Sequence, residues 1–191
     1  MRLQEGNVVA VRTPLLAIPG KKVRMGTDPG PAVVLITGVM ASGKSTVAEL
    51  LAGQLPRAAD VRGDVFRRMV VSGREELSPE ETTEARAQLD LRYRLSALVA
   101  NEYAHHGWIT VVQDINLGDD LTRYVARVHT RPLLVVVLAP SITVVRAREA
   151  ARPKAGYGAW TVEALDHALR AETPRIGLWL DTSEHTPALT I

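Results

Sequence analysis

The chain has 191 residues, of which 46% are apolar and only 4% aromatic, enough for one compact domain with an aliphatic core. The formal net charge of +2 and the scarcity of aromatic side chains argue against a basic, base-stacking surface for nucleic acid. The absence of cysteine excludes disulfides, thiolate metal sites and a catalytic thiol.

The sequence contains no segment long enough to cross a membrane as a helix. The longest apolar stretch, residues 133–140, is far shorter than the ~20 residues that a transmembrane helix needs. The amino terminus carries Glu5, and Arg12 and Pro14 interrupt the apolar residues that follow, unlike a secretory signal peptide. We therefore expect a cytoplasmic protein without a membrane partner.

Residues 1–30 differ in character from the rest of the chain. Two short apolar runs, residues 8–11 and 15–18, precede a segment rich in proline and glycine. This pattern is typical of an appendage, such as a short hairpin followed by a linker. We expect residues 31–191 to form the folded domain.

The rest of the sequence alternates strand-like apolar runs with segments of helical period. Predicted strands lie at residues 32–37, 58–62, 108–113, 132–138 and 177–180. Predicted helices lie at residues 44–55, 79–105, 119–128, 142–151 and 162–171. In the second helix, the apolar residues that recur at the spacing of an inward face are Ala85, Leu89, Leu91, Leu95, Leu98 and Val99. The alternation predicts an α/β fold of three layers, with a five-stranded parallel sheet flanked by helices.

Residues 38–45, GVMASGKS, match the pattern G-x-x-x-x-G-K-[ST] between a predicted strand and a predicted helix, as a phosphate-binding loop (P-loop) requires. Glycines let backbone N–H groups face phosphates, and the helix N-terminus adds its positive end. We expect Lys44 to reach the β- and γ-phosphates of ATP and Ser45 to bind Mg²⁺. The predicted nucleotide-binding residues are Gly38, Ala41, Ser42, Gly43, Lys44, Ser45 and Thr46.

Two aspartates follow predicted strands, at the edge of the sheet where open α/β folds bind ligands. Asp114 suits Mg²⁺ or its water shell, and its alternative role is that of a turn or cap residue. Asp64 is placed to take the proton of an acceptor hydroxyl, and its alternative role is that of a helix N-cap. We also expect Asn116 to contact the acceptor.

Arginines cluster in two other segments. Arg67 and Arg68 are candidates for contacts with an anionic substrate, although arginines on a helix face are commonly just solvated. Arg148 and Arg152 precede a loop rich in glycine and proline, and together these features predict a lid near residues 148–160 that closes over the transferred phosphate. The alternative is that these arginines only complement the dipole at a helix C-terminus.

With these residues in view, the sequence resembles the P-loop phosphotransferases typified by the chloramphenicol phosphotransferase-like family. The resemblance covers most of residues 32–158. It rests on the loop at 38–46, on Asp64, on residues 114–118 (DINLG) as an Asp-x-x-Leu-Gly segment, and on residues 148–152 (REAAR) as an Arg-Glu-x-x-Arg lid.

This resemblance implies ATP-dependent phosphorylation of a hydroxyl on a small molecule. It further implies that Asp64 is the base and that Arg148 and Arg152 stabilise the transferring charge. The first 30 residues have no counterpart in that family, and residues 174–182 look more like the last strand of the wider kinase group. Because such families diverge over residues 65–106, where the acceptor binds, chloramphenicol itself is not supported as the substrate.

Two other functions remain open at this point. A polynucleotide 5′-hydroxyl kinase shares the same phosphate loop but needs a basic channel for the strand, which the near-neutral charge disfavours. A nucleotide-binding switch or regulatory protein is the second alternative, although the guanine-reading sequence Asn-Lys-x-Asp of a GTPase does not occur. The favoured hypothesis is a kinase with ATP and Mg²⁺ as cofactors and a small-molecule hydroxyl acceptor as partner.

Overall fold

The computed structural model describes residues 30–152 and 157–191. The predicted hairpin and linker of the amino-terminal appendage, and the centre of the predicted lid, lie outside the described residues. Within the described part, no helix is long and apolar enough to span a bilayer.

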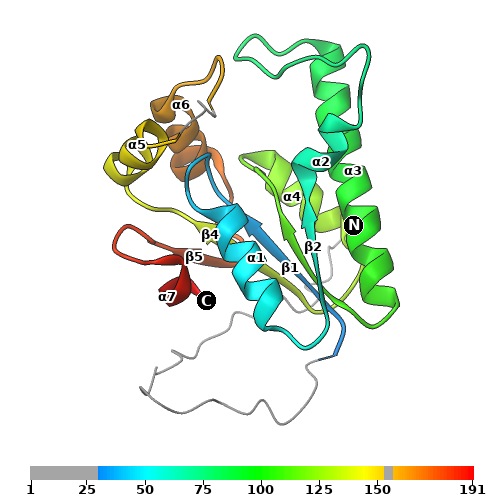
Figure 1. Cartoon of the computed structure of the whole chain (residues 1–191). Helices are drawn as coiled ribbons and strands as arrows, with labels where there is room; N and C mark the ends of the chain where they lie inside the picture. Colours follow the sequence, from blue (N-terminus) through cyan, green and yellow to red (C-terminus); the bar gives the residue numbers. More distant parts are fainter. Residues whose placement is uncertain (1–29, 153–156) are drawn as a thin grey trace, which may run out of the picture.

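The fold is α/β, with one parallel sheet of five strands in the order β2-β3-β1-β4-β5 (Figure 1). The strands are β1 Ala32–Thr37, β2 Ala58–Arg62, β3 Ile109–Gln113, β4 Leu133–Leu138 and β5 Leu178–Leu180. The first strand of the described residues, β1, lies at the centre, where Val33 is in register with Thr110 of β3 and Leu133 of β4. The predicted fold class is confirmed, and each predicted strand is present to within one residue at either end.

Helices cover both faces of the sheet, and together with it they make three layers. The helical elements are α1 Lys44–Gln54, α2 Gly63–Arg68, α3 Thr83–His105, α4 Asp119–Arg127, α5 Ile142–Ala150, α6 Val162–His167, the π-helix η1 Ala168–Glu172 and α7 Pro187–Thr190. Side chains on a strand alternate between the two faces. Along β1, Val34 and Ile36 therefore pack in the core with α1, whereas Val33 and Leu35 pack in the core with α3 and α4.

The helix α3 differs from its prediction in two ways. It begins at Thr83 and not at residue 79, because the Thr82 side chain accepts a hydrogen bond from the Ala85 N–H and caps the helix. Leu91 and Leu98 are exposed, so the prediction that they face inward is wrong. The buried face is made by small residues and one tyrosine, namely Ala85, Tyr93, Ser96, Ala97, Ala100 and Ala104.

Candidate functional site

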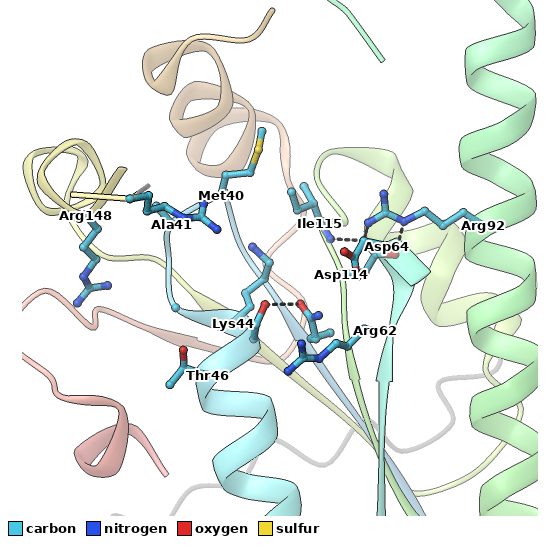
Figure 2. Close-up of a pocket in the computed structure, with 14 residues that line it drawn as sticks. Met40, Ala41, Lys44, Thr46, Arg62, Asp64, Arg92, Asp114, Ile115 and Arg148 are labelled. Carbon is cyan, nitrogen blue, oxygen red and sulfur yellow. Dashed lines mark hydrogen bonds and ion pairs between the residues drawn. The ribbon is translucent and has the colours of Figure 1, made fainter. Parts of the chain in front are cut away.

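A cavity of about 380 Å³ lies at the carboxyl edge of the sheet, above the loop that joins β1 to α1. Figure 2 shows Lys44 in its middle, with Arg148 on one side and the Asp114–Arg92 pair on the other. The parallel strands bring the residues after β1, β2 and β3 to this one edge, so segments far apart in the sequence share one pocket.

The loop before α1 has the tight backbone that its glycines predict. Gly38 has φ 142°, and a Cβ there would lie 2.4 Å from the carbonyl oxygen of Leu138, so only glycine fits. Gly43, with φ 99°, is the N-cap of α1. No side chain caps this helix, and its first turn contains no acidic residue. The N–H groups at the start of α1 are therefore available to an anion.

Lys44 is folded back onto its own loop. Its Nζ donates a hydrogen bond of 2.7 Å to the carbonyl oxygen of Val39, and the residue is only 7% exposed. Burial lowers the pKa of Lys44 to about 7, and the nearby Asp114 carboxylate only partly opposes this. The Lys44 amine is thus desolvated, and a phosphate that enters the cavity stabilises its charged form.

Ser45 supplies a hydroxyl beside the lysine. Its Oγ donates to Oε1 of Gln113, the last residue of β3, at 3.3 Å. Both atoms are uncharged oxygens, and Mg²⁺ binds such oxygens together with water and phosphate oxygens. The pair therefore suits a magnesium ion as ligands. Within residues 30–152 and 157–191, no cluster of three or more histidine, aspartate or glutamate side chains could hold a metal by itself.

Asp114 forms a buried ion pair. Its side chain is fully buried, and Arg92 of α3 binds it through two hydrogen bonds, one of them Nε to Oδ2 at 2.9 Å. The Ile115 N–H donates to Oδ1 at 2.7 Å. Burial raises the pKa of Asp114, and Arg92 opposes that shift. Asp114 lines the cavity, and its oxygens already accept hydrogen bonds from Arg92 and Ile115; its role as a metal ligand stays a prediction.

Asp64 lies in the first turn of α2 and lines the cavity. The N-cap of α2 is Arg62, and no side chain caps the helix, so the alternative role of Asp64 as an N-cap is wrong. The Asp64 carboxylate pairs with Arg68 at 3.0 Å and is 49% exposed. A half-exposed carboxylate on the wall of the phosphate cavity is available to a substrate hydroxyl.

Both predicted lid arginines also line the cavity. Arg148, on α5, donates to the carbonyl oxygens of Ser42 at 3.3 Å and Thr182 at 3.0 Å, which joins α5 to the phosphate loop. Arg152 pairs with Glu149 at 3.2 Å. Figure 2 shows Arg148 on the side of the cavity opposite Asp64 and Arg92.

The residues predicted to bind the acceptor are in three different environments. Arg67 pairs with Glu76 and lines a second cavity, described below, whereas Arg68 is largely exposed and holds Asp64. Asn116 is fully buried, and its side-chain amide has no hydrogen-bond partner in the described part of the chain. Asn116 is not among the residues that line the phosphate cavity or the second cavity, and its contact with the acceptor stays a prediction.

Sequence reasoning missed Arg92 and Gln113. Gln113 immediately precedes Asp114 at the end of a predicted strand, so its position at the ligand edge could have been found from the sequence. Arg92 carries no such signal, because only the packing of α3 across the sheet brings it to Asp114.

The central parallel sheet, the glycine-bound loop and the buried lysine at the start of α1 define a P-loop protein of the α/β class. The AAA_33 family, described as an AAA domain, matches residues 33–178, and the chain belongs to this family. The finer resemblance to the chloramphenicol phosphotransferase-like family remains a prediction. No curated protein sequence matches the chain.

Solved structures share the fold. A sugar kinase from Janibacter sp. HTCC2649 has a TM-score of 0.59 at 20% identity, over 84% of this chain and 89% of that one. The tunicamycin resistance protein of Deinococcus radiodurans has a TM-score of 0.59 at 18% identity, over 82% and 89%. A chain of the Pnkp1/Rnl/Hen1 RNA repair complex has a TM-score of 0.57 at 16% identity, over 78% and 46%. At these identities the likeness establishes the fold alone.

Proposed function

We propose that the protein transfers the γ-phosphate of ATP to a hydroxyl group of a small molecule. The observation that carries this proposal is that the phosphate cavity adjoins a second cavity of about 510 Å³, and that Met40, Arg92 and Ile115 line both. A donor site that opens directly into an acceptor site is what in-line transfer requires. The likeness to a sugar kinase and to an antibiotic resistance protein supports the same function.

The residues of the phosphate cavity have distinct roles in this reaction. Lys44 exchanges the Val39 carbonyl oxygen for phosphate oxygens. Ser45 and Gln113 would hold Mg²⁺, which neutralises phosphate charge when bound. Arg148 and Arg152 line the same cavity and stabilise the transferring charge.

Asp64 completes the proposed mechanism as the base. The acceptor oxygen attacks the γ-phosphorus, the bond from that phosphorus to the β,γ-bridging oxygen breaks, and ADP leaves. The hydroxyl proton passes to the Asp64 carboxylate, which lies on the wall of the same cavity. Arg68, at 3.0 Å, keeps this carboxylate in place before the acceptor binds.

The test is transfer of labelled γ-phosphate from ATP, with Mg²⁺, to a panel of hydroxylated antibiotics, nucleosides, sugars and 5′-hydroxyl oligonucleotides. We expect a labelled small-molecule product, and we expect Asp64→Asn to lower kcat by about 10²- to 10⁴-fold while nucleotide still binds. Lys44→Ala removes the cation that contacts the phosphates and abolishes transfer. Asp90→Asn is the matched control, because Asp90 pairs with Arg127 away from the cavity and its loss leaves transfer unchanged.

Two results would refute the proposal. Label that reaches only oligonucleotides supports the polynucleotide kinase, whose one favourable observation is the fold shared with the RNA repair complex. Release of free phosphate whatever acceptor is added supports a nucleotide-dependent switch.

A further inference from the structure

The second cavity is enclosed by α3, the chain before it, the end of β3 and the segment that leads into α6. Its apolar wall contains Leu77, Leu89, Leu117 and Trp160, which are enough to cover one face of a ring-bearing molecule. Tyr93 adds a phenol whose hydroxyl donates to the Ile115 carbonyl oxygen and is therefore already used. This wall suits an acceptor with an apolar body.

Each arginine in the described lining of this cavity is already paired with a carboxylate. Arg67 binds Glu76, and Arg92 binds the buried Asp114. Arg86 binds Asp120 through two hydrogen bonds, one of them Nη1 to Oδ2 at 3.0 Å. An anionic acceptor would have to compete with these carboxylates, and in two of the pairs, Arg86–Asp120 and Arg92–Asp114, the carboxylate is buried and its loss as a partner is costly.

Among the described residues of the lining, acidic side chains outnumber basic ones. Glu76, Glu81, Asp120 and Glu172 line the cavity, against the three arginines described above. Glu81 lies 3.8 Å from Arg86, which already has Asp120 as its partner. Outside the lining, Glu76 and Asp120 each have a second arginine partner, Arg74 and Arg123. The described charges therefore nearly balance, and the lining offers an anion no arginine without a carboxylate partner.

From this arrangement we infer that the acceptor is a hydroxylated molecule with an apolar, ring-bearing body and no anionic group. Sugar phosphates, sugar acids, nucleoside monophosphates and nucleic acid strands are excluded by the same ion pairs. The inference rests on the proposed function, since it concerns the acceptor side of the same reaction. It concerns binding, however, so it can be tested without phosphate transfer.

The first test measures binding to the full chain without nucleotide or Mg²⁺, by ligand-observed NMR. Two matched pairs serve as probes: phenyl β-D-glucoside against phenyl β-D-glucuronide, and adenosine against AMP. We expect the neutral member of each pair to bind at least about tenfold more tightly, because the anionic member gives up its hydration without gaining an arginine that lacks a partner. Trp160 reports the location, because its fluorescence should change on binding and the change should be absent in Trp160→Phe.

The second test reduces the preference for neutral probes by changing one carboxylate of the cavity. Glu76→Gln releases Arg67 from its partner and provides the cavity with an unpaired cation, so the preference for the neutral probe should fall by about tenfold. Glu80→Gln is the matched control, because Glu80 is exposed and does not line the cavity, and it should leave the preference unchanged.

These results separate the two proposals. Neutral probes that bind at Trp160 without being phosphorylated support the acceptor class and contradict the kinase. Equal or tighter binding of the glucuronide and AMP overturns the acceptor class even if label is transferred. The proposed acceptor class is also overturned if neither neutral probe binds. It is overturned as well if Glu76→Gln keeps the wild-type preference for the neutral probes.

Discussion

Gly63 and Asp114 approach each other so closely that a Cβ on Gly63 would lie 1.8 Å from Oδ2 of Asp114. The first residue of α2 therefore forms part of the wall against which the Asp114–Arg92 ion pair is packed. The site needs glycine here for space, because no contact at this distance is possible without moving the carboxylate.

The first prediction concerns this contact. Gly63→Ala should lower the free energy of unfolding by about 1–3 kcal/mol, because the new methyl group displaces the Asp114 carboxylate from Arg92. Gly53→Ala is the control: Gly53 lies within α1, a Cβ there would meet open space, and alanine should stabilise the protein by about 0.5–1 kcal/mol. Urea denaturation measures both values, and equal effects of the two substitutions would contradict the prediction.

The ion pair itself gives the second prediction. Arg92→Met should lower the free energy of unfolding by about 3–5 kcal/mol, because it leaves the buried Asp114 charge without its partner. The double variant Arg92→Met/Asp114→Leu should be more stable than Arg92→Met alone, since it removes the orphaned charge. Arg127→Met removes the more exposed pair with Asp90 and should lower the free energy of unfolding by about 1 kcal/mol or less. Strictly additive effects in the urea-unfolding cycle at positions 92 and 114 would refute this account.

The third prediction concerns stability and pH. Because burial lowers the pKa of Lys44 to about 7 from its ordinary 10.5, the folded protein releases this proton at a lower pH than the unfolded chain does. The unfolded state then binds more protons, so the stability of the nucleotide-free protein should rise by up to about 2–3 kcal/mol from pH 7 to pH 9. Below pH 7 this contribution is constant. Urea titrations should show a rise that is absent in Lys44→Met.

Nucleotide binding should have the opposite pH dependence, and this is the fourth prediction. Phosphate oxygens favour the charged form of Lys44, so a nucleotide that binds above pH 7 must bring a proton with it. At pH 8.5, calorimetry in buffers of different ionisation enthalpy should detect uptake of about one proton per nucleotide. The affinity should fall by up to about tenfold per pH unit above pH 7. No dependence on the buffer would show that Lys44 is already charged in the free protein.

Much of this site could be predicted from the sequence, because it depends on local backbone. The pattern at residues 38–45 contains its own glycines and follows a strand, so the position of Lys44 follows from near neighbours in the chain. Asp64 and Asp114 could be placed at the ligand edge for a similar reason, since each comes just after a strand. The prediction of the sheet succeeded on the same grounds.

What failed depends on tertiary packing. Asp114 could be placed, but its role could not be assigned, because its partner Arg92 comes from a helix whose rotation is set by the core. The apolar periodicity of α3 was right in part: Ala85 is buried and Leu89 and Val99 pack against the core. Leu91 and Leu98 stay outside, since alanines allow the helix to approach the sheet closely. The charge balance of the second cavity could not be predicted from the sequence either, because its ion pairs join residues from separate elements.

The central position of β1 also determines when the phosphate loop can form during synthesis. Both hydrogen-bonded neighbours of β1 are later strands, β3 and β4, while β2, the next to leave the ribosome, pairs only with β3. A nascent chain that ends after α3 contains every residue of the loop but neither strand that holds β1 in place. The phosphate site is therefore encoded early in the chain and assembled late.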